Sequence, residues 1–166
     1  MQIIYNQSAT EDFGGKTLEA LGVKRCYLKH ITISHKNDDF TKKAHHHTGF
    51  EAHAILRGEQ KYELCGETIT VGAGDILIIP PMLRHRVVSA SVDTEKTSIC
   101  FDKDDCDGIS YVFARIPKSL AAALELAKEE YYSPLCYSQT RIEAATITAV
   151  CDVLRLSGVK SAAPPR

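Results

Sequence analysis

The feature that most limits the fold of this chain is a series of short segments, between residues 24 and 116, that are rich in β-branched and aromatic side chains. Gly, Asp and Pro separate these segments at intervals of about 8 to 12 residues, which is typical of antiparallel sandwiches and barrels. The candidate strands are residues 27–33, 50–58, 60–66, 67–75, 75–80, 84–91, 96–102 and 109–116. We therefore predict a mostly β fold.

The pattern changes after residue 116. Pro117 stands where the first residue of a helix tolerates proline, and apolar residues then recur at helical spacing up to the break at residues 133–134. A second helix is predicted from about residue 139 to residue 157, with Gly158 as its stop signal. The chain thus divides into a β domain at 1–116, a helical segment at 117–158 and a linker-like tail at 159–166.

The second predicted helix carries two apolar stripes. One consists of Ile142, Ala145, Ala149, Val153 and Leu156, and the other of Ile147, Val150 and Leu154. A helix with such a wide apolar face can pack on its own domain and still offer a surface to a second copy of the chain. The alternative is that the preceding helix simply covers the second stripe.

Composition narrows the class of protein. A chain of 166 residues has room for one well-buried core, and 44% hydrophobic residues argue against disorder over any sizeable part. The net charge is −1 and the basic residues are scattered, so we expect no nucleic-acid surface within these residues. The first residues lack the pattern of a secretion signal and no apolar stretch has membrane-spanning length, so we expect a cytoplasmic protein without a membrane partner.

The six cysteines are dispersed and form no C-x-x-C pair. This spacing argues against a zinc ribbon and against a thioredoxin-like centre. We expect the cysteines to be reduced, partly buried side chains.

Four histidines and a glutamate lie close together in the stretch AHHHTGFEAH, residues 44–53. Alternate residues of a strand face the same side, so His45, His47, Glu51 and His53 are expected on one face, with His46 exposed on the other. Burying such groups is costly unless they meet a metal, a ligand or one another. Downstream, His85 follows an apolar strand and a Pro-Pro turn, where it can point back into the same cavity.

Three imidazoles and one carboxylate suit zinc, nickel, iron or manganese and leave coordination positions open. We predict His45, His47, Glu51 and His85 as ligands of one divalent metal, in a pocket where His53 has a supporting role. The other interpretation is a polar cluster without metal, hydrogen-bonded internally and to water. Secondary candidates are Tyr62 and Arg84 for ligand specificity, whereas His30 and His35 are expected to be structural or at the surface.

The spacing H-x-H-x₃-E-x₆-G is met by His45, His47, Glu51 and Gly58, and G-x₅-P-x₄-H by Gly74, Pro80 and His85. Together these resemble the two motifs of the cupin superfamily, which implies a double-stranded β-helix, or jelly-roll, barrel. Two positions depart from the pattern: Met82 replaces the usual glycine and Ser89 the usual asparagine. These changes leave the four ligand positions intact and weaken any link to one particular cupin enzyme family.

A narrower resemblance covers residues 45–87, the strand ending near residue 102 and the two terminal helices. This arrangement is similar to the N-terminal ligand-binding and dimerisation domain of AraC-type transcriptional regulators. The resemblance implies that the barrel binds a small effector, often a sugar, and that the helices pair two subunits into a homodimer. DNA would be bound only by a helix-turn-helix domain absent from this chain, and the tail KSAAPPR favours a sensory part of a longer protein.

The function that this resemblance implies is small-molecule sensing and dimerisation in transcription regulation. The alternative is a stand-alone mononuclear metal-dependent cupin enzyme, such as a dioxygenase, a decarboxylase or a sugar isomerase, with the metal held by the four predicted ligands. A third possibility is a metal-free binding module. Because no general acid or base other than His53 lies near the ligands in sequence, a binding domain is favoured over an enzyme.

Overall fold

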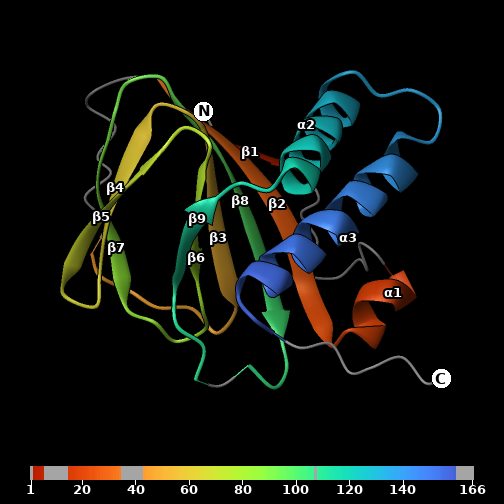
Figure 1. The fold of residues 1–166 in the computed structure, drawn as a ribbon. Helices are drawn as coiled ribbons and strands as arrows, with labels where there is room; N and C mark the ends of the chain where they lie inside the picture. Colours follow the sequence, from red (N-terminus) through yellow and green to blue (C-terminus); the bar gives the residue numbers. More distant parts are fainter. Residues whose placement is uncertain (1, 6–14, 35–42, 107, 160–166) are drawn as a thin grey trace.

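The computed structural model describes residues 2–5, 15–34, 43–106 and 108–159, and contains two sheets and three helices in that part of the chain (Figure 1). The strands are β1 (Gln2–Tyr5), β2 (Val23–Ile33), β3 (Phe50–Arg57), β4 (Glu59–Leu64), β5 (Glu67–Gly72), β6 (Asp75–Ile79), β7 (His85–Ala90), β8 (Thr94–Lys103) and β9 (Val112–Arg115). The helices are α1 (Gly15–Ala20), α2 (Lys118–Tyr132) and α3 (Ser138–Leu156).

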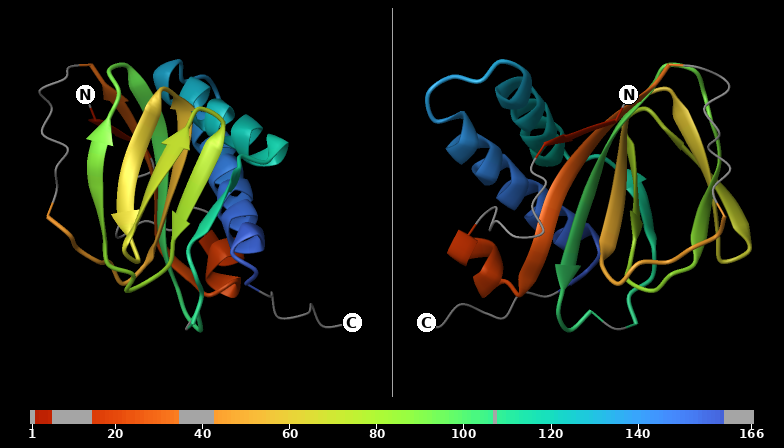
Figure 2. Two further views of the ribbon diagram at one scale, coloured as in Figure 1. Left: turned by 60° about the vertical axis from the view of Figure 1, so that its left-hand side comes forward. Right: turned by 180° about the vertical axis from the view of Figure 1, so that it is seen from behind.

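The strands form a six-stranded sheet in the order β1-β2-β8-β3-β6-β9 and a three-stranded sheet in the order β5-β4-β7. The paired strands run antiparallel in both sheets. The two sheets face each other, and the helices cover the outer face of the larger sheet (Figures 1 and 2). The predicted mostly β fold with two C-terminal helices is confirmed.

Strand β3 shows how the sequence sorts residues between two apolar cores. Phe50, Ala52 and Ala54 point toward the helices and join the core between the six-stranded sheet and α1, α2 and α3. Ile55 lies on the opposite face and joins the core between the two sheets, together with Tyr62 and residues of β5, β6 and β7. This alternation is the one predicted from the sequence, and it directs Glu51 and His53 into the barrel.

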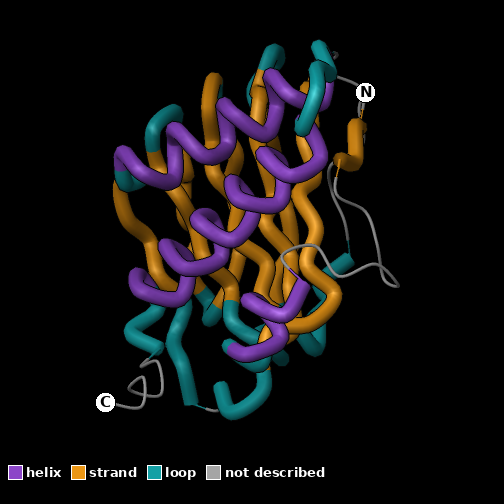
Figure 3. Tube along the Cα trace, turned by 90° about the vertical axis from the view of Figure 1, so that its right-hand side faces the viewer, coloured by secondary structure: helices purple, strands orange, loops and turns teal. Residues whose placement is uncertain are grey.

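Helices α2 and α3 lie side by side across the larger sheet (Figure 3). Leu120 and Leu124 of α2 and Ala149 and Val153 of α3 are fully buried in the core beneath them. The second apolar stripe of α3 is also covered within the chain, since Val150 is 0% and Leu154 8% exposed. Ile147 packs against the same core, so this stripe is used inside the subunit and does not by itself provide a surface for a second copy.

The first two elements were not predicted. Strand β1 carries no clear pattern over four residues and is held by pairing with β2, a contact between distant segments that composition cannot reveal. Helix α1 has only six residues, too few for a helical period to stand out. No helix in the described part of the chain is both long and apolar enough to cross a membrane.

Candidate functional site

Three separate parts of the chain bring the predicted metal ligands together. Glu51 lies in β3 and His85 begins β7, whereas His45 and His47 precede β3, which starts only at Phe50. The expected strand alternation therefore does not place these two histidines. Instead, His45 and His85 exchange two backbone hydrogen bonds of 2.9 Å each, as an isolated antiparallel bridge.

The segment around His47 is fixed in a similar way. The backbone N–H of Met82 donates a hydrogen bond of 2.7 Å to the carbonyl oxygen of His47. Met82 has φ 65, the left-handed conformation that the glycine usual at this motif position adopts without strain. The turn after Pro80 thus holds a methionine in a backbone conformation that favours glycine.

The four side chains converge at one point. One ligand atom from each of His45, His47, Glu51 and His85 can be chosen so that all lie within 4.8 Å of one another. Glu51 Oε2 is 3.0 Å from His47 Nε2 and 3.3 Å from His85 Nε2. His85 is buried, His45 and Glu51 are half-buried and His47 is exposed, so the cluster lies between the barrel interior and solvent.

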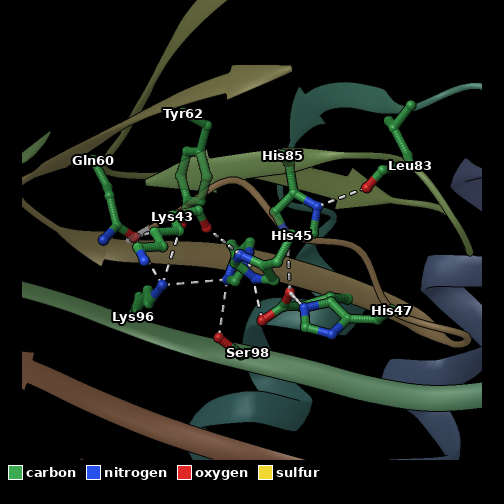
Figure 4. Close-up of polar contacts among 11 residues, drawn as sticks. Lys43, His45, His47, Gln60, Tyr62, Leu83, His85, Lys96 and Ser98 are labelled. Atoms are coloured by element: carbon green, nitrogen blue, oxygen red, sulfur yellow. Dashed lines mark hydrogen bonds and ion pairs between the residues drawn. The ribbon is translucent and has the colours of Figure 1, made fainter. Parts of the chain in front are cut away.

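Backbone carbonyl groups orient two of the imidazole rings. The carbonyl oxygen of Lys43 lies 2.9 Å from His45 Nδ1, and that of Leu83 lies 2.8 Å from His85 Nδ1 (Figure 4). A carbonyl oxygen only accepts, so each Nδ1 carries a proton, and in the neutral form of either ring the lone pair is on Nε2. This is the arrangement in which a histidine binds a metal through Nε2.

His85 has a hydrogen-bond acceptor at each ring nitrogen, namely the carbonyl of Leu83 and the carboxylate of Glu51. A neutral imidazole has a single N–H and cannot donate to both. With the proton on Nδ1, the lone pair of His85 Nε2 faces the carboxylate of Glu51, and a cation between the two groups would satisfy both. The donor set and the orientation of the rings both fit a divalent metal of the zinc or iron type.

The surroundings of Glu51 favour its ionised form. Burial alone would raise the pKa of this carboxyl, but the imidazole groups of His53, His47 and His85 around it outweigh burial and hold the pKa well below its usual range. Glu51 is therefore an anion at neutral pH, as a metal ligand must be.

His53 lies deeper in the barrel and is 4% exposed. Its Nε2 is 3.5 Å from Glu51 Oε1 and its Nδ1 is 3.0 Å from Ser98 Oγ, while its ring stacks on that of Tyr62. Burial, followed by the charge of Lys96, lowers the pKa of His53 to about 4, so the ring is neutral at pH 7. His53 thus lies behind Glu51, on the side of the barrel interior.

Lys96 is a site residue that the sequence reading missed. It is 5% exposed, and its Nζ donates to Gln60 Oε1 at 2.8 Å and to Tyr62 Oη at 3.2 Å, and lies 3.3 Å from His53 Nδ1 (Figure 4). A lysine near the start of a strand is usually solvated. The sequence does show that Lys96 and Ser98 share one face of a strand, and both line the cavity. Which face of β8 points into the barrel is fixed only by the pairing of β8 with β3.

These groups surround a cavity of about 90 Å³ inside the barrel. Its lining consists of Lys29, Ile31, His45, Glu51, His53, His85, Val87, Lys96 and Ser98. His45, Glu51 and His85 are at the same time members of the four-residue cluster, so a metal held there would border the cavity.

The remaining candidates lie outside the four-residue cluster. His46 is exposed as predicted, and Arg84 is also exposed. Tyr62 is fully buried beside His53 and Lys96. His30 is not at the surface: it is 3% exposed in β2, where Glu95 and Thr97 contact its ring, while His35 lies outside the described residues.

Comparison with known proteins agrees with this architecture. Residues 28–110, half of the chain, match the family model of the AraC-like ligand binding domain. The chain belongs to this family, and its barrel is a cupin barrel with two C-terminal helices, as predicted. A comparison with curated protein sequences gives no significant match.

Several solved structures are similar at low sequence identity. KdgF from Halomonas sp. has a TM-score of 0.45 and 14% identity, over 63% of this chain and 79% of that one. A cupin superfamily protein from Desulfitobacterium hafniense has a TM-score of 0.42 and 14% identity, over 63% and 77% of the two chains. A cupin 2 conserved barrel domain protein from Salinispora arenicola has a TM-score of 0.43 and 14% identity, over 62% and 75%.

Proposed function

We propose that this chain is the effector-sensing domain of an AraC-type transcriptional regulator and binds a small polar molecule inside its barrel. The observation that carries the proposal is the polar cavity of about 90 Å³, lined by charged and imidazole groups, in a member of a ligand-binding family. A largely preformed concave site with a few convergent polar groups is what recognition of a small molecule requires.

We further propose that His45, His47, Glu51 and His85 hold one divalent metal at the edge of this cavity. The carbonyl-bound Nδ1 atoms and the acceptor on each side of His85 support this assignment. When bound, such a metal supplies an open coordination position and a fixed positive charge for an oxygen atom of the ligand. The chain's own residues orient the ring nitrogens and keep Glu51 ionised.

Strand β8 offers a direct route from the cavity to the helices. Lys96 and Ser98 line the cavity, whereas Glu95 points to the opposite face and accepts a hydrogen bond of 2.8 Å from Lys128 of α2. A ligand that draws Lys96 toward it would also bias the position of Glu95 and hence of α2. In this proposal the helices pair two copies of the chain, and DNA is bound by a domain outside these 166 residues.

The metal part of the proposal is tested by elemental analysis of protein purified without a histidine tag, together with thermal unfolding in the presence of zinc, nickel, iron(II) or manganese. We expect about one metal ion per chain or saturable stabilisation by at least one ion, because a bound ion stabilises the folded state by mass action. His85→Ala should abolish both effects, while His46→Ala, the exposed neighbour, should change neither. Absence of any metal effect in the wild-type chain would reject the assignment.

A metal-dependent enzyme is the second candidate, because the cavity adjoins three of the four cluster residues and thus gives a substrate access to a metal. Both ring nitrogens of His53 are engaged, by Glu51 on one side and by Ser98 and Lys96 on the other. His53 is therefore poorly placed to take a proton from a substrate, which favours sensing. Turnover of a bound molecule by the metal-loaded chain, lost in His85→Ala, would establish the enzyme instead.

A further inference from the structure

We infer that His53 is a positioning residue of the proposed metal site. Its Nε2–H group faces one carboxylate oxygen of Glu51, Oε1, and leaves the other oxygen, Oε2, to bind the metal. This role deepens the proposed function and rests on its metal site. It depends on the fixed orientation of the His53 ring, on the ring nitrogen that carries the proton, and on the different surroundings of the two carboxylate oxygens.

The ring of His53 is fixed inside the barrel. The residue is 4% exposed, and its ring stacks on that of Tyr62 with 4.9 Å between the centroids. Nδ1 lies 3.0 Å from Ser98 Oγ, and Nε2 lies 3.5 Å from Glu51 Oε1. Turning the ring over would remove both polar contacts from buried groups, which is costly. The Nε2 edge of the ring therefore faces Glu51.

Lys96 determines which ring nitrogen carries the proton. Its Nζ lies 2.8 Å from Gln60 Oε1, 3.2 Å from Tyr62 Oη and 3.3 Å from His53 Nδ1 (Figure 4). An ammonium group has three hydrogens and no acceptor, so His53 Nδ1 is the accepting atom of its pair. A neutral imidazole has one N–H, and in His53 this N–H is consequently at Nε2, toward Glu51 Oε1.

The proton of His53 is thus on the opposite nitrogen from the protons of His45 and His85. Those two rings have Nδ1 beside a backbone carbonyl oxygen, which leaves the Nε2 lone pair for a metal. His53 presents an N–H group to Glu51, and an N–H group cannot bind a metal. Residues that hold a ligand in this way tune how tightly the metal binds without touching it. His53 accordingly acts on the metal through Glu51.

The two oxygens of Glu51 have different surroundings. Oε2 lies 3.0 Å from His47 Nε2 and 3.3 Å from His85 Nε2, whereas Oε1 lies near His53. One oxygen of Glu51 and one nitrogen from each of the three histidines make four ligand atoms, so a six-coordinate ion keeps positions open. A carboxylate that bound through both oxygens would fill one of these positions. By engaging Oε1, His53 keeps that position available to a molecule in the cavity.

The position of the proton can be measured on the wild-type chain without metal. Nuclear magnetic resonance of the nitrogen-15-labelled protein at neutral pH, through two-bond couplings between ring protons and ring nitrogens, distinguishes the tautomers of histidine. We expect a proton on Nε2 in His53 and on Nδ1 in His45 and His85, with the His53 signals assigned by their loss in His53→Gln. A proton on Nδ1 of His53, or on both of its nitrogens, would overturn the inference.

A matched pair of amide variants tests the effect on the metal. The amide nitrogen of glutamine can take the place of His53 Nε2, whereas asparagine is one methylene shorter and does not reach Glu51. Binding of Co²⁺ would be followed by its visible absorption, which depends on the coordination geometry. We expect His53→Asn to bind Co²⁺ roughly tenfold more weakly or worse, with an altered spectrum. His53→Gln should stay within about threefold of the wild type and keep its spectrum.

His30→Asn is the matched control, because it makes the same substitution at another buried histidine, in β2 beside Glu95 and outside the four-residue cluster. It should leave the affinity for Co²⁺ and the spectrum unchanged even if it lowers stability. Circular dichroism checks the folding of each variant. If His53→Asn does not fold, the tautomer measured on the wild-type chain still decides.

Two results with the variants would contradict the role of His53. These are an unchanged affinity and spectrum in His53→Asn, and an equal loss of affinity in His53→Asn and His53→Gln. Either result, obtained while the wild-type chain binds Co²⁺, would leave the proposed metal site standing. A wild-type chain that binds neither Co²⁺ nor another divalent metal would reject the site itself, and with it the role of His53.

Discussion

At the scale of single residues, the candidate site depends on groups that orient its ligands without belonging to them. The carbonyls of Lys43 and Leu83 fix the tautomers of His45 and His85. The backbone N–H of Met82 donates a hydrogen bond to the carbonyl oxygen of His47 and so fixes the backbone there. Such supporting contacts place the ring nitrogens before anything binds, so that binding costs little reorganisation. Met82 is unusual among them because its own conformation is strained.

Replacing Met82 by glycine should stabilise the protein. Met82 is 61% exposed and loses little packing, while its φ of 65 is unfavourable for a residue with a Cβ atom. Relief of about 1–2 kcal/mol of strain, less about 0.5–1 kcal/mol for the added flexibility of glycine in the unfolded chain, predicts a net gain of up to about 1.5 kcal/mol.

The measurement is chemical denaturation of Met82→Gly beside the wild type. Leu83→Gly, at the adjacent half-buried position, serves as the control and should destabilise the chain, because it loses apolar contacts in the barrel core and gains backbone freedom. A loss of stability in Met82→Gly would show that the side chain contributes more than its exposure indicates.

At the scale of elements, β8 joins the two halves of the molecule. On its outer face Glu95 receives Lys128 of α2 at 2.8 Å and lies 3.3 Å from the buried ring of His30. Arg57 of β3 approaches the same carboxylate at 4.0 Å. The contacts of Glu95 lie beside the apolar interface between α2 and the sheet. Their main effect is therefore to fix the position of α2 along the sheet, while the apolar contacts contribute most of the stability.

Lys128→Met should destabilise the fold by about 1–2 kcal/mol, because Glu95 is only 16% exposed and loses a charged hydrogen-bond partner. Lys118→Met, at an exposed position on the same helix, should change the free energy of unfolding by less than about 0.5 kcal/mol. Urea denaturation of both variants measures the difference. Equal stability of the two variants would mean that the contact with Glu95 has no net energetic value.

The cost of Lys128→Met should depend on pH. Burial raises the pKa of Glu95, but the hydrogen bond and charge of Lys128, then His30 and Arg57, outweigh it, so the folded-state pKa lies below the ordinary value of 4.5. A carboxyl with a lowered pKa contributes stability that is present above its unfolded-state pKa and is lost as pH falls through the folded-state pKa. The difference between variant and wild type should therefore be full above about pH 5 and shrink below pH 4.5.

His30 adds to acid sensitivity in the same direction. Burial lowers its pKa, and the charge of Lys128 lowers it further while Glu95 and Glu125 oppose that change, so the unfolded chain takes up the proton first as pH falls below 6.5. Wild-type stability should thus begin to decline below pH 6.5. Denaturation curves at intervals between pH 4 and pH 8 test both expectations, and a difference for Lys128→Met that grows on acidification would contradict the first.

At the scale of the whole molecule, the proposed pairing of two copies depends on the outer surface of α2 and α3. The second apolar stripe of α3, which suggested it, is packed within the chain at Val150 and Leu154. What remains exposed on the two helices includes small side chains, Ala121 and Ala122 of α2 and Ala144 of α3. Small residues allow helices of two subunits to approach closely.

We expect sedimentation equilibrium to show a dimer at micromolar concentration. Ala144→Glu should weaken this dimer while leaving the stability of the single subunit nearly unchanged, because the position is solvent-exposed in the subunit. Thr68→Glu, an exposed position on β5 in the sheet away from the helices, is the matched control and should have no effect. A monomer at all concentrations would reject dimerisation through these helices.

Much of the architecture could be predicted from the sequence because it depends on local patterns. The eight predicted strands correspond to β2 to β9, and the alternation along β3 placed Glu51 and His53 in the barrel. The remainder depends on contacts between distant segments. His45 is positioned by a bridge to His85, and Lys96 faces inward because β8 pairs with β3. Neither arrangement can be predicted from the spacing of residues that are close in the sequence.

The alternation along β8 also bears on how proteins of this design can diversify. Lys96 and Ser98 face the cavity, while their neighbours Glu95 and Thr97 face α2 and the buried ring of His30. Substitutions on one face need not disturb contacts on the other. A lineage could therefore acquire a preference for a different ligand through changes at positions 96 and 98 while the contacts of β8 with α2 are conserved. The same two positions are the natural choice for a library of variants that seeks a response to a new ligand.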